Sequence, residues 1–221
     1  MSRFFLEFFA RGRQTVVMPK KAPAPSPHSY HHGHLHDALV RTARHILEKE
    51  GFAALSLRRV AHAAGVSPAA PYHHFADKQA LLDAVAEEGF AALRSGMLAR
   101  MAKKANPAAR LDACGVGYVL FAVENPALFQ LMFGRSDREE PANEALAAAS
   151  ELAQEVLQTA VAQCSPGDKV NPLTSLRLWA LAHGVAKLIL EAGVKPTDYG
   201  LKSTEKLVES LLDRGKWEKA G

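Results

Sequence analysis

The chain has 221 residues, a formal net charge of +4 and a pI of about 9.1. Its 48% hydrophobic and 23% charged residues are typical of a soluble globular protein, and no valine-rich alternating run indicates a sheet. The mild positive charge is compatible with nucleic-acid binding without establishing it. Cys114 and Cys164 are far apart and outside metal-type spacing, which fits a reduced cytoplasmic compartment and excludes a disulfide framework.

The first 29 residues differ in composition from the rest. Residues 1–17 contain aromatic residues and arginines, but Glu7 interrupts the apolar run, so the segment is a poor signal peptide and too short for a membrane helix. Residues 18–29 are rich in proline, alanine and lysine, a composition typical of disorder. We expect residues 1–29 to be a disordered or mis-annotated extension and linker, with translation starting at Met18. A helix on a membrane surface is the alternative for residues 1–17.

A first helix is predicted over residues 34–50, followed by the helix-stopping Gly51. Its apolar stripe consists of Leu35, Leu39, Ala43, Ile46 and Leu47.

Two shorter helices and a tight turn are predicted next. Ser56 is placed to cap the first, and Gly65 ends it where a positive φ is inexpensive. Ser67 and Pro68 suit the start of the second, but Pro71 predicts that this helix is short or distorted. The plan is a helix-turn-helix, which lays its second helix in the DNA major groove.

A long helix is predicted from Asp77, its N-cap, to about residue 104, where it would link the two domains. Beyond it, helical patterns cover residues 108–123, 127–133, 143–163 and 171–191, and a last helix runs from 198 or 203 to 214. The predicted fold class is therefore all-α with about nine helices: an N-terminal three-helix helix-turn-helix domain plus a C-terminal helical bundle.

The residues around the turn resemble the DNA-binding domain of the TetR family of bacterial transcriptional regulators, over about residues 30–90. The matching positions are Val60-Ala61, Ala64-Gly65-Val66-Ser67, Tyr72, His74-Phe75, Lys78 and Leu81-Leu82. The chain departs from the family at Ala69, Ala70 and Pro71, where a glycine, a hydroxylated residue and an aliphatic residue are usual. The two alanines could read bases only by apolar contact, for example with a thymine methyl group.

The resemblance implies that the Tyr72 hydroxyl and the Lys78 ammonium contact phosphate. At Lys78, the helix N-terminus adds its own positive partial charge. His73 is a candidate for a base or phosphate contact, whereas His74 could instead pack in the core. The predicted DNA-binding residues are Ser56, Arg58, Ser67, Ala69, Ala70, Tyr72, His73, His74 and Lys78.

Histidines gather in the N-terminal part: nine of the ten lie between His28 and His74, so this end would gain positive charge below about pH 6.5. Four of them fall within residues 30–36, which invites a metal-site interpretation. No cysteine or carboxylate cluster joins them, and the resemblance places this segment close to DNA, so we favour contact with phosphate or the minor groove.

The C-terminal half carries a second, narrower resemblance. Residues 179–184, WALAHG, are similar to the Trp-His-Gly (WHG) signature of one TetR C-terminal domain group, and residues 121–133 are similar to the same group. The resemblance implies that this half binds an effector and dimerises. The predicted effector pocket consists of Phe121, Phe129, Met132, Phe133, Trp179 and His183. Each of these could also be plain core, and their character weakly favours an apolar effector.

The predicted domains are residues 30–80 for DNA binding, 81–214 for effector binding and dimerisation, and 215–221 as a tail. We expect a cytoplasmic, ligand-responsive repressor that binds a palindromic operator as a homodimer, with half-sites about 34 Å apart. The last two helices would form the dimer interface, with Leu207, Leu211 and Leu212 suited to that role.

Other classes of protein are less favoured by the sequence. No paired carboxylates, phosphate-cradling loop, HExxH or nucleophile elbow indicates an enzyme, and no cofactor is expected. A histidine-rich metal-handling or metal-responsive helical protein is the alternative.

Overall fold

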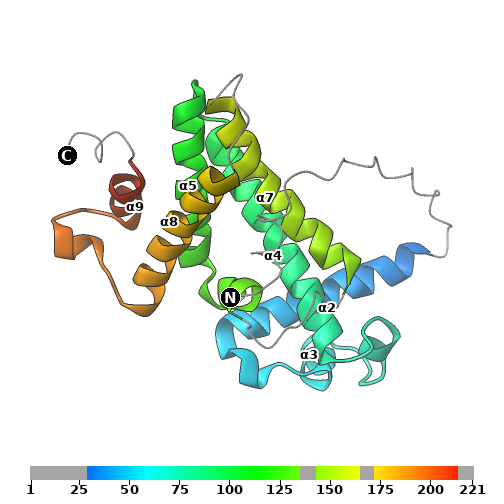
Figure 1. Ribbon diagram of the computed structural model, residues 1–221. Helices are drawn as coiled ribbons and strands as arrows, with labels where there is room; N and C mark the ends of the chain where they lie inside the picture. The colour runs from blue at the N-terminus through cyan, green and yellow to red at the C-terminus, as the bar shows by residue number, and fades with distance from the viewer. Residues whose placement is uncertain (1–28, 135–142, 165–171, 214–221) are drawn as a thin grey trace.

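The computed structural model describes residues 29–134, 143–164 and 172–213. Within these ranges the chain forms eight α-helices and three short 3-10 helices and contains no strand (Figure 1). The predicted all-α class is confirmed, with a helix count close to the expected nine. The predictions for residues 1–28 of the N-terminal extension and for the tail, residues 215–221, lie outside these ranges.

The N-terminal unit is built on α2 (Ser29–Glu50), which begins before the predicted start. It is followed by η1 (Phe52–Ala54), α3 (Leu57–Ala63) and η2 (Ala70–His73). The apolar stripe of α2 packs against α3 and against the segment after η2, because these elements bury their hydrophobic faces against one another. Buried members of this small core are Leu39, Val40, Ala43, Ile46, Leu47, Leu57, Val60, Ala61 and Phe75.

The predicted cap and stop signals of α3 are confirmed, whereas the predicted start of the second helix at Ser67 and Pro68 is wrong, because η2 begins at Ala70 without a side-chain cap. The Ser56 hydroxyl accepts from the backbone N–H of Arg59 at 3.1 Å, as an N-cap does. Gly65 has φ of +71°, and the N–H of Val66 closes the helix end by donating to the carbonyl of Ala61 at 3.0 Å. The chain can therefore reverse directly after α3.

Helix α4 (Lys78–Met101) joins the two parts of the molecule without a break. The Asp77 carboxylate caps it by accepting from the N–H of Ala80 at 2.8 Å. Its first half packs on α2, and its second half enters a bundle with α5 (Pro107–Glu124), α6 (Pro126–Phe133) and α7 (Glu144–Cys164) (Figure 1). A rotation of α4 would thus move both parts of the chain.

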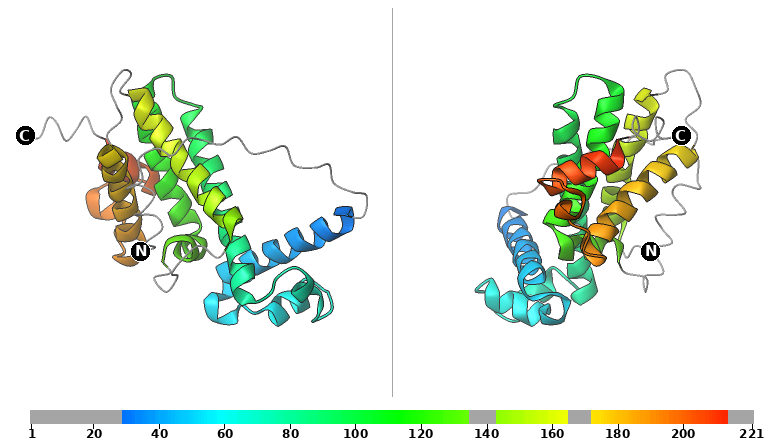
Figure 2. Two further views of the ribbon diagram at one scale, coloured as in Figure 1. Left: turned by 45° about the vertical axis from the view of Figure 1, so that its right-hand side comes forward. Right: turned by 90° about the vertical axis from the view of Figure 1, so that its left-hand side faces the viewer.

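The last helices lie together on one outer side of the bundle: α8 (Pro172–Glu191), η3 (Pro196–Tyr199) and α9 (Thr204–Leu212) (Figure 2). The side chains of Leu207 and Leu212 are 2% and 7% exposed, because α9 packs them against the chain's own α5 and α8. The prediction that Leu207 and Leu212 face a partner subunit is therefore wrong, since neither has surface left to bury. Leu211 is half-buried.

Helix α6 lies unusually close to α4 at Gly89. A Cβ at this position would come within 2.7 Å of the Met132 sulfur and 3.0 Å of Leu128 Cδ1. At its other end, α6 meets the N-terminal unit: Arg44 Nη2 donates to Asn125 Oδ1 at 2.9 Å. Asn125 links α5 to α6, so this hydrogen bond ties that junction to α2.

A chain of polar groups runs through the apolar core of the C-terminal bundle. The indole N–H of Trp179 donates to Tyr118 Oη at 3.3 Å, and Tyr118 Oη lies 2.8 Å from His183 Nδ1. Burial, reinforced by the Lys187 ammonium, lowers the pKa of His183 to about 4. Tyr118 Oη and Nδ1 of the neutral imidazole share this hydrogen bond, and the imidazole ring packs among Phe129, Phe133 and Trp179.

The lowered pKa of His183 makes the protein sensitive to acid. Between about pH 6.5 and about 4, the unfolded chain binds a proton at His183 that the folded chain does not, so the free energy of unfolding falls as pH falls through this window. Urea denaturation should show the stability advantage of the wild type over His183→Gln shrinking from about pH 7 to about pH 5. A stability advantage that stays constant over this range would contradict the prediction. The other histidines are present in both proteins, so their titration cancels in the comparison.

The contact at Gly89 predicts a difference between two glycines of the same helix. Gly89→Ala should lower the free energy of unfolding by about 1–3 kcal/mol, because the added methyl group overpacks the α4–α6 contact. Gly96→Ala should raise it by about 0.5–1 kcal/mol, because alanine favours the helix and a Cβ there meets no atom within 4 Å. Equal effects of the two substitutions in urea denaturation would rule out the close approach.

Candidate functional site

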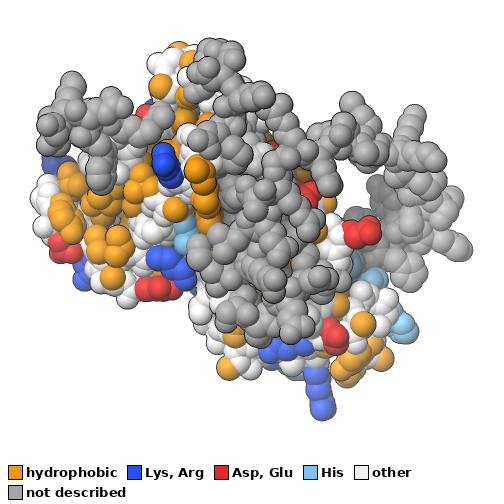
Figure 3. Space-filling model, in the orientation of Figure 1, with side chains coloured by type: hydrophobic (Ala, Val, Ile, Leu, Met, Phe, Trp, Pro, Cys, Tyr) orange, Lys and Arg blue, Asp and Glu red, His pale blue; other side chains and the backbone are white. Residues whose placement is uncertain are grey.

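Most of the predicted DNA-binding residues lie on the surface at the N-terminal end of the molecule. Figure 3 shows Lys, Arg and His side chains at this end, in the lower part of the view. The exposed ones are Ser56, Arg58, Ser67, Ala69, Tyr72, His73 and Lys78, and the half-buried ones are Ala70 and His74. Tyr72 is 60% exposed, an unusual degree for an aromatic side chain that is not in contact with a partner.

The segment after the turn is narrower than an α-helix. The N–H groups of Ala70, Tyr72 and His74 donate to the carbonyls of Ser67, Ala69 and Pro71, so the bonds span three residues instead of four. Pro71 is buried and has no N–H to give, which removes a bond that an α-helix would need. The predicted distortion is confirmed: the segment is a 3-10 helix, and it leaves Tyr72 and His73 exposed.

Two cations near this segment are held by their own chain. Lys78 Nζ donates to the carbonyl of Phe52 at 3.2 Å, which keeps the ammonium beside the N-terminus of α4. Arg59 is paired with Glu50 at 2.8 Å, whereas its neighbour Arg58 is exposed. Of the two arginines, Arg58 is therefore the better placed for a phosphate contact.

His74 differs from its neighbour His73 because it turns toward the core. Its ring lies 6.0 Å from the ring of His36 in α2 and 6.3 Å from that of Phe75, centroid to centroid. His74 therefore helps to hold the 3-10 segment against α2. The side chains of residues 29–34 lie outside the described part of the chain, and among the described residues no three His, Cys, Asp or Glu side chains come together as a metal site.

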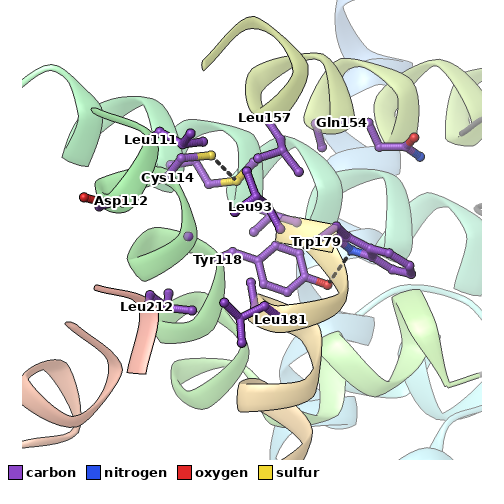
Figure 4. Close-up of a pocket in the computed structure, with 15 residues that line it drawn as sticks. Leu93, Leu111, Asp112, Cys114, Tyr118, Gln154, Leu157, Trp179, Leu181 and Leu212 are labelled. Atoms are coloured by element: carbon purple, nitrogen blue, oxygen red, sulfur yellow. Dashed lines mark hydrogen bonds between the residues drawn. The ribbon is translucent and has the colours of Figure 1, made fainter. Parts of the chain in front are cut away.

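The C-terminal bundle contains an apolar cavity of about 60 Å³ between α4, α5, α7, α8 and α9 (Figure 4). Its wall includes the thiol of Cys114, which lies 3.7 Å from the Met97 sulfur, and burial raises the pKa of this thiol to about 12. The described lining residues are Leu93, Met97, Leu111, Asp112, Cys114, Gly115, Tyr118, Ala153, Gln154, Leu157, Leu178, Trp179, Leu181, Ala182 and Leu212.

Of the six residues predicted for a pocket, Trp179 belongs to this lining. Phe129, Phe133 and His183 instead form the aromatic cluster behind Tyr118, and Met132 packs at Gly89. Phe121 is buried near the end of α5, where its carbonyl accepts from the N–H of Asn125. The cluster and the cavity share the Tyr118 and Trp179 side chains, so the predicted residues adjoin the cavity instead of surrounding it.

Sequence reasoning missed most of the cavity wall. Leu93, Met97 and Leu157 have the helical spacing of ordinary core residues, and no pattern distinguishes a side chain that borders a void. One signal was available: Ser150 and Gln154 place two polar side chains one turn apart on the buried face of α7, where they are 3% and 5% exposed. A buried amide on an alanine-rich helix face needs a partner, which is a reason to look for a ligand.

Comparisons with known proteins agree with this arrangement. A family model described as bacterial regulatory proteins, tetR family, matches residues 39–85, and a model described as tetracyclin repressor-like, C-terminal domain, matches residues 111–214. The HTH-type transcriptional regulator BetI of Rhizobium meliloti (strain 1021) is 25% identical over 183 residues, which cover 80% of this chain and 86% of BetI.

Two solved structures extend the likeness to the whole fold. A protein of unknown function from Rhodococcus sp. RHA1 is 32% identical with a TM-score of 0.67, over 84% of this chain and 93% of that one. AibR, solved in complex with isovaleryl coenzyme A and operator DNA, is 20% identical with a TM-score of 0.55. The likeness covers 79% of this chain and 94% of AibR. With both of its parts matched by family models and the whole fold by these structures, the chain belongs to the TetR family of DNA-binding transcriptional regulators.

Proposed function

We propose that this regulator is a ligand-responsive repressor that binds a palindromic operator as a homodimer. The observation that carries the proposal is the exposure of Tyr72, His73 and Lys78 in η2 and at the N-terminus of α4. Residues 30–80 would bind DNA and residues 81–214 would bind the effector and dimerise. Members of the family are soluble cytoplasmic proteins, and we place this chain in the same compartment. The metal-handling alternative finds no support in the comparisons.

The DNA contacts divide into two kinds. Contacts to the phosphate backbone would come from the Tyr72 phenol, the Lys78 ammonium, the helix N-terminus at Ser56 and the Arg58 guanidinium. Such contacts position the protein on DNA without reading its sequence. The 3-10 segment would face the major groove. There, His73 can hydrogen-bond a base edge, and the other candidate base contacts are Ser67, Ala69 and Ala70, of which the alanines offer only methyl groups. His74 would act by holding this segment in place.

For the dimer interface we propose one face of α8. The window Leu173–Glu191 is long and apolar enough to cross a membrane by length and composition, and a third of it (33%) is buried within the chain. Its outward stripe consists of Leu173, Arg177, Ala180, Gly184, Lys187, Leu188 and Glu191. Charges along this stripe argue against lipid, whereas the small Ala180 and Gly184 permit a second helix to approach closely. A Cβ at Gly184 would meet no atom within 4 Å, so this surface is open.

For the effector site we propose the apolar cavity beside Tyr118 and Trp179, in a C-terminal domain that resembles the Trp-His-Gly group. An effector there would contact the same two side chains that support the aromatic cluster on α6. Since α6 contacts α4 at Gly89 and α2 through Arg44 and Asn125, a change in its packing would reach the DNA-binding unit. The effector acts by binding one arrangement of the two units better than the other. The AibR complex with an acyl ligand and operator DNA is consistent with such a role for this fold.

The DNA face is tested by selecting DNA from a random pool and measuring affinity by fluorescence anisotropy across a salt series. We expect enrichment of a palindrome with half-sites about one helical turn apart. Lys78→Ala should weaken binding to every sequence and reduce the salt slope by about one unit, whereas His73→Ala should change sequence preference.

The control for this experiment is Lys103→Ala, which removes an exposed cation from the C-terminal bundle and should leave DNA binding unchanged. If the Lys78 and His73 variants both bound DNA as the wild type does, the placement of the recognition segment would be refuted. Absence of any enriched sequence would refute the repressor itself.

The dimer interface is tested by placing a charge at the centre of the α8 stripe. Gly184→Glu should convert the dimer to a monomer in sedimentation equilibrium, because it would bury an unpaired carboxylate against the partner helix. Ala148→Glu on the exposed face of α7 should leave the dimer intact. A Gly184→Glu protein that remained dimeric would require a different interface.

A further inference from the structure

The apolar cavity and a larger groove beside it share part of their walls. The groove, of about 960 Å³, lies between α4, α5 and α9, whereas the cavity holds about 60 Å³. Asp112 of α5 and Leu212 of α9 line both spaces. Figure 4 shows these two side chains at the edge of the cavity opposite Trp179. Since a residue that borders both spaces stands between them, the side chain of Leu212 forms part of the partition.

Leu212 closes this partition by packing on a glycine. Gly115 lines the cavity, and a Cβ at this position would come within 3.0 Å of Leu212 Cδ1. The absence of a side chain at Gly115 lets Leu212 lie directly against α5, where it is buried. Movement of Leu212 away from Gly115 would therefore join the cavity to the groove.

Helix α9 is the least firmly attached part of the cavity wall. It has nine residues, whereas α4, α5, α7 and α8, which form the rest of the wall, have 18 to 24 residues each. It buries Leu207, Val208 and Leu212, but none of residues 192–206, which lead into it, is buried. A segment with few buried contacts opens at a lower free energy than the whole fold. We therefore expect α9 to detach while the other helices stay packed.

One ion pair holds α9 across the groove. Arg100 Nη1 of α4 lies 2.6 Å from Glu205 Oε1 in the first turn of α9. The hydrogen bond from Arg100, together with its charge, lowers the pKa of Glu205, so this carboxylate is ionised at neutral pH. Both side chains are partly exposed, so the pair stabilises the whole fold only slightly. Its loss would favour the detached position of α9 without removing a core contact.

From this arrangement we propose that α9 is a lid over the cavity, held shut by Arg100 and Glu205. When α9 moves away from α5, Leu212 leaves Gly115 and a small molecule passes from the groove into the cavity. The purpose of such a lid rests on the effector site proposed above, whereas its opening can be measured without DNA.

The thiol of Cys114 reports entry into the cavity, because it forms part of the wall. In a Cys164→Ser background it is the only cysteine of the chain. Methyl methanethiolsulfonate, a small uncharged reagent, converts this thiol to a mixed disulfide and releases methanesulfinate, and mass spectrometry follows the rate. At reagent concentrations that keep the reaction slower than closing, the labelling rate is proportional to the population of the open lid.

Release of α9 should speed this labelling. Arg100→Gln and Glu205→Gln should each raise the rate about two- to fivefold, the range expected for a partly exposed ion pair. Leu212→Ala should raise it at least about tenfold, because it removes the side chain that separates the two spaces. Lys206→Gln is the matched control: it breaks the pair between Lys206 and Glu209, which lies within α9 and does not reach α4, and should label as the parent does.

Gly89→Ala separates lid opening from global unfolding, because its added methyl group meets α6 and lowers global stability without touching α9. This variant should label at the parent rate. An increase that matches its loss of global stability would show that Cys114 reacts through the unfolded chain, and would overturn the inference. Arg100 and Leu212 variants that label as the parent does would also overturn it, and would place the entrance elsewhere, for example between α7 and α8.

The labelled protein tests the effector site separately. The methylthio group added to Cys114 lies in the cavity, so its effect on affinity for the selected operator reports coupling between the cavity and the DNA face. Labelling that depends on α9, with unchanged DNA affinity, would support the lid and contradict the effector site. Altered DNA affinity, with labelling that is the same in all α9 variants, would support the effector site and overturn the lid.

Discussion

The close approach of α6 to α4 at Gly89 is the constraint on which the rest of the structure depends. Without a Cβ at this position, the Met132 sulfur and Leu128 can lie directly against the long helix. The adjacent face of α6 supplies Phe129 and Phe133 to the aromatic cluster, and the helix begins directly after Asn125, the residue bonded to α2. One short helix thus touches the linker helix, the DNA-binding unit and the wall of the cavity. Any displacement of α6 must change at least two of these contacts, because the interior is close-packed.

The sequence predicted the N-terminal unit well because its signals are local. Ser56, Gly65 and Asp77 act through bonds to residues three to five positions away, and each does so in the structure. Pro71 likewise predicted the distortion of the second helix, because a missing N–H has the same consequence in any context. These positions needed no knowledge of the tertiary fold.

The cavity and the role of α9 could not be predicted in the same way. Helical periodicity identifies a buried face but not what lies opposite it, so Leu93 next to a void looks the same as Phe129 within a full cluster. Leu207 and Leu212 were expected to meet a second subunit, yet an apolar face fits a neighbouring helix of its own chain equally well. The sequence did predict α8 in the dimer interface, but the exposed stripe through Ala180 and Gly184 could not be identified from residues too small to mark an apolar face.

The 3-10 segment has a consequence for how this regulator could acquire new binding preferences. Pro71 anchors the segment in the core, while Ala69 projects only a methyl group from its exposed side. On the proposed DNA face, a longer side chain at Ala69 would add a contact to DNA without disturbing the packing beneath it. Regulators whose recognition helix is already filled with polar side chains must lose one specificity to gain another. If this segment reads the operator as proposed, its alanine positions leave room for a change in operator preference through intermediates that still bind the original site.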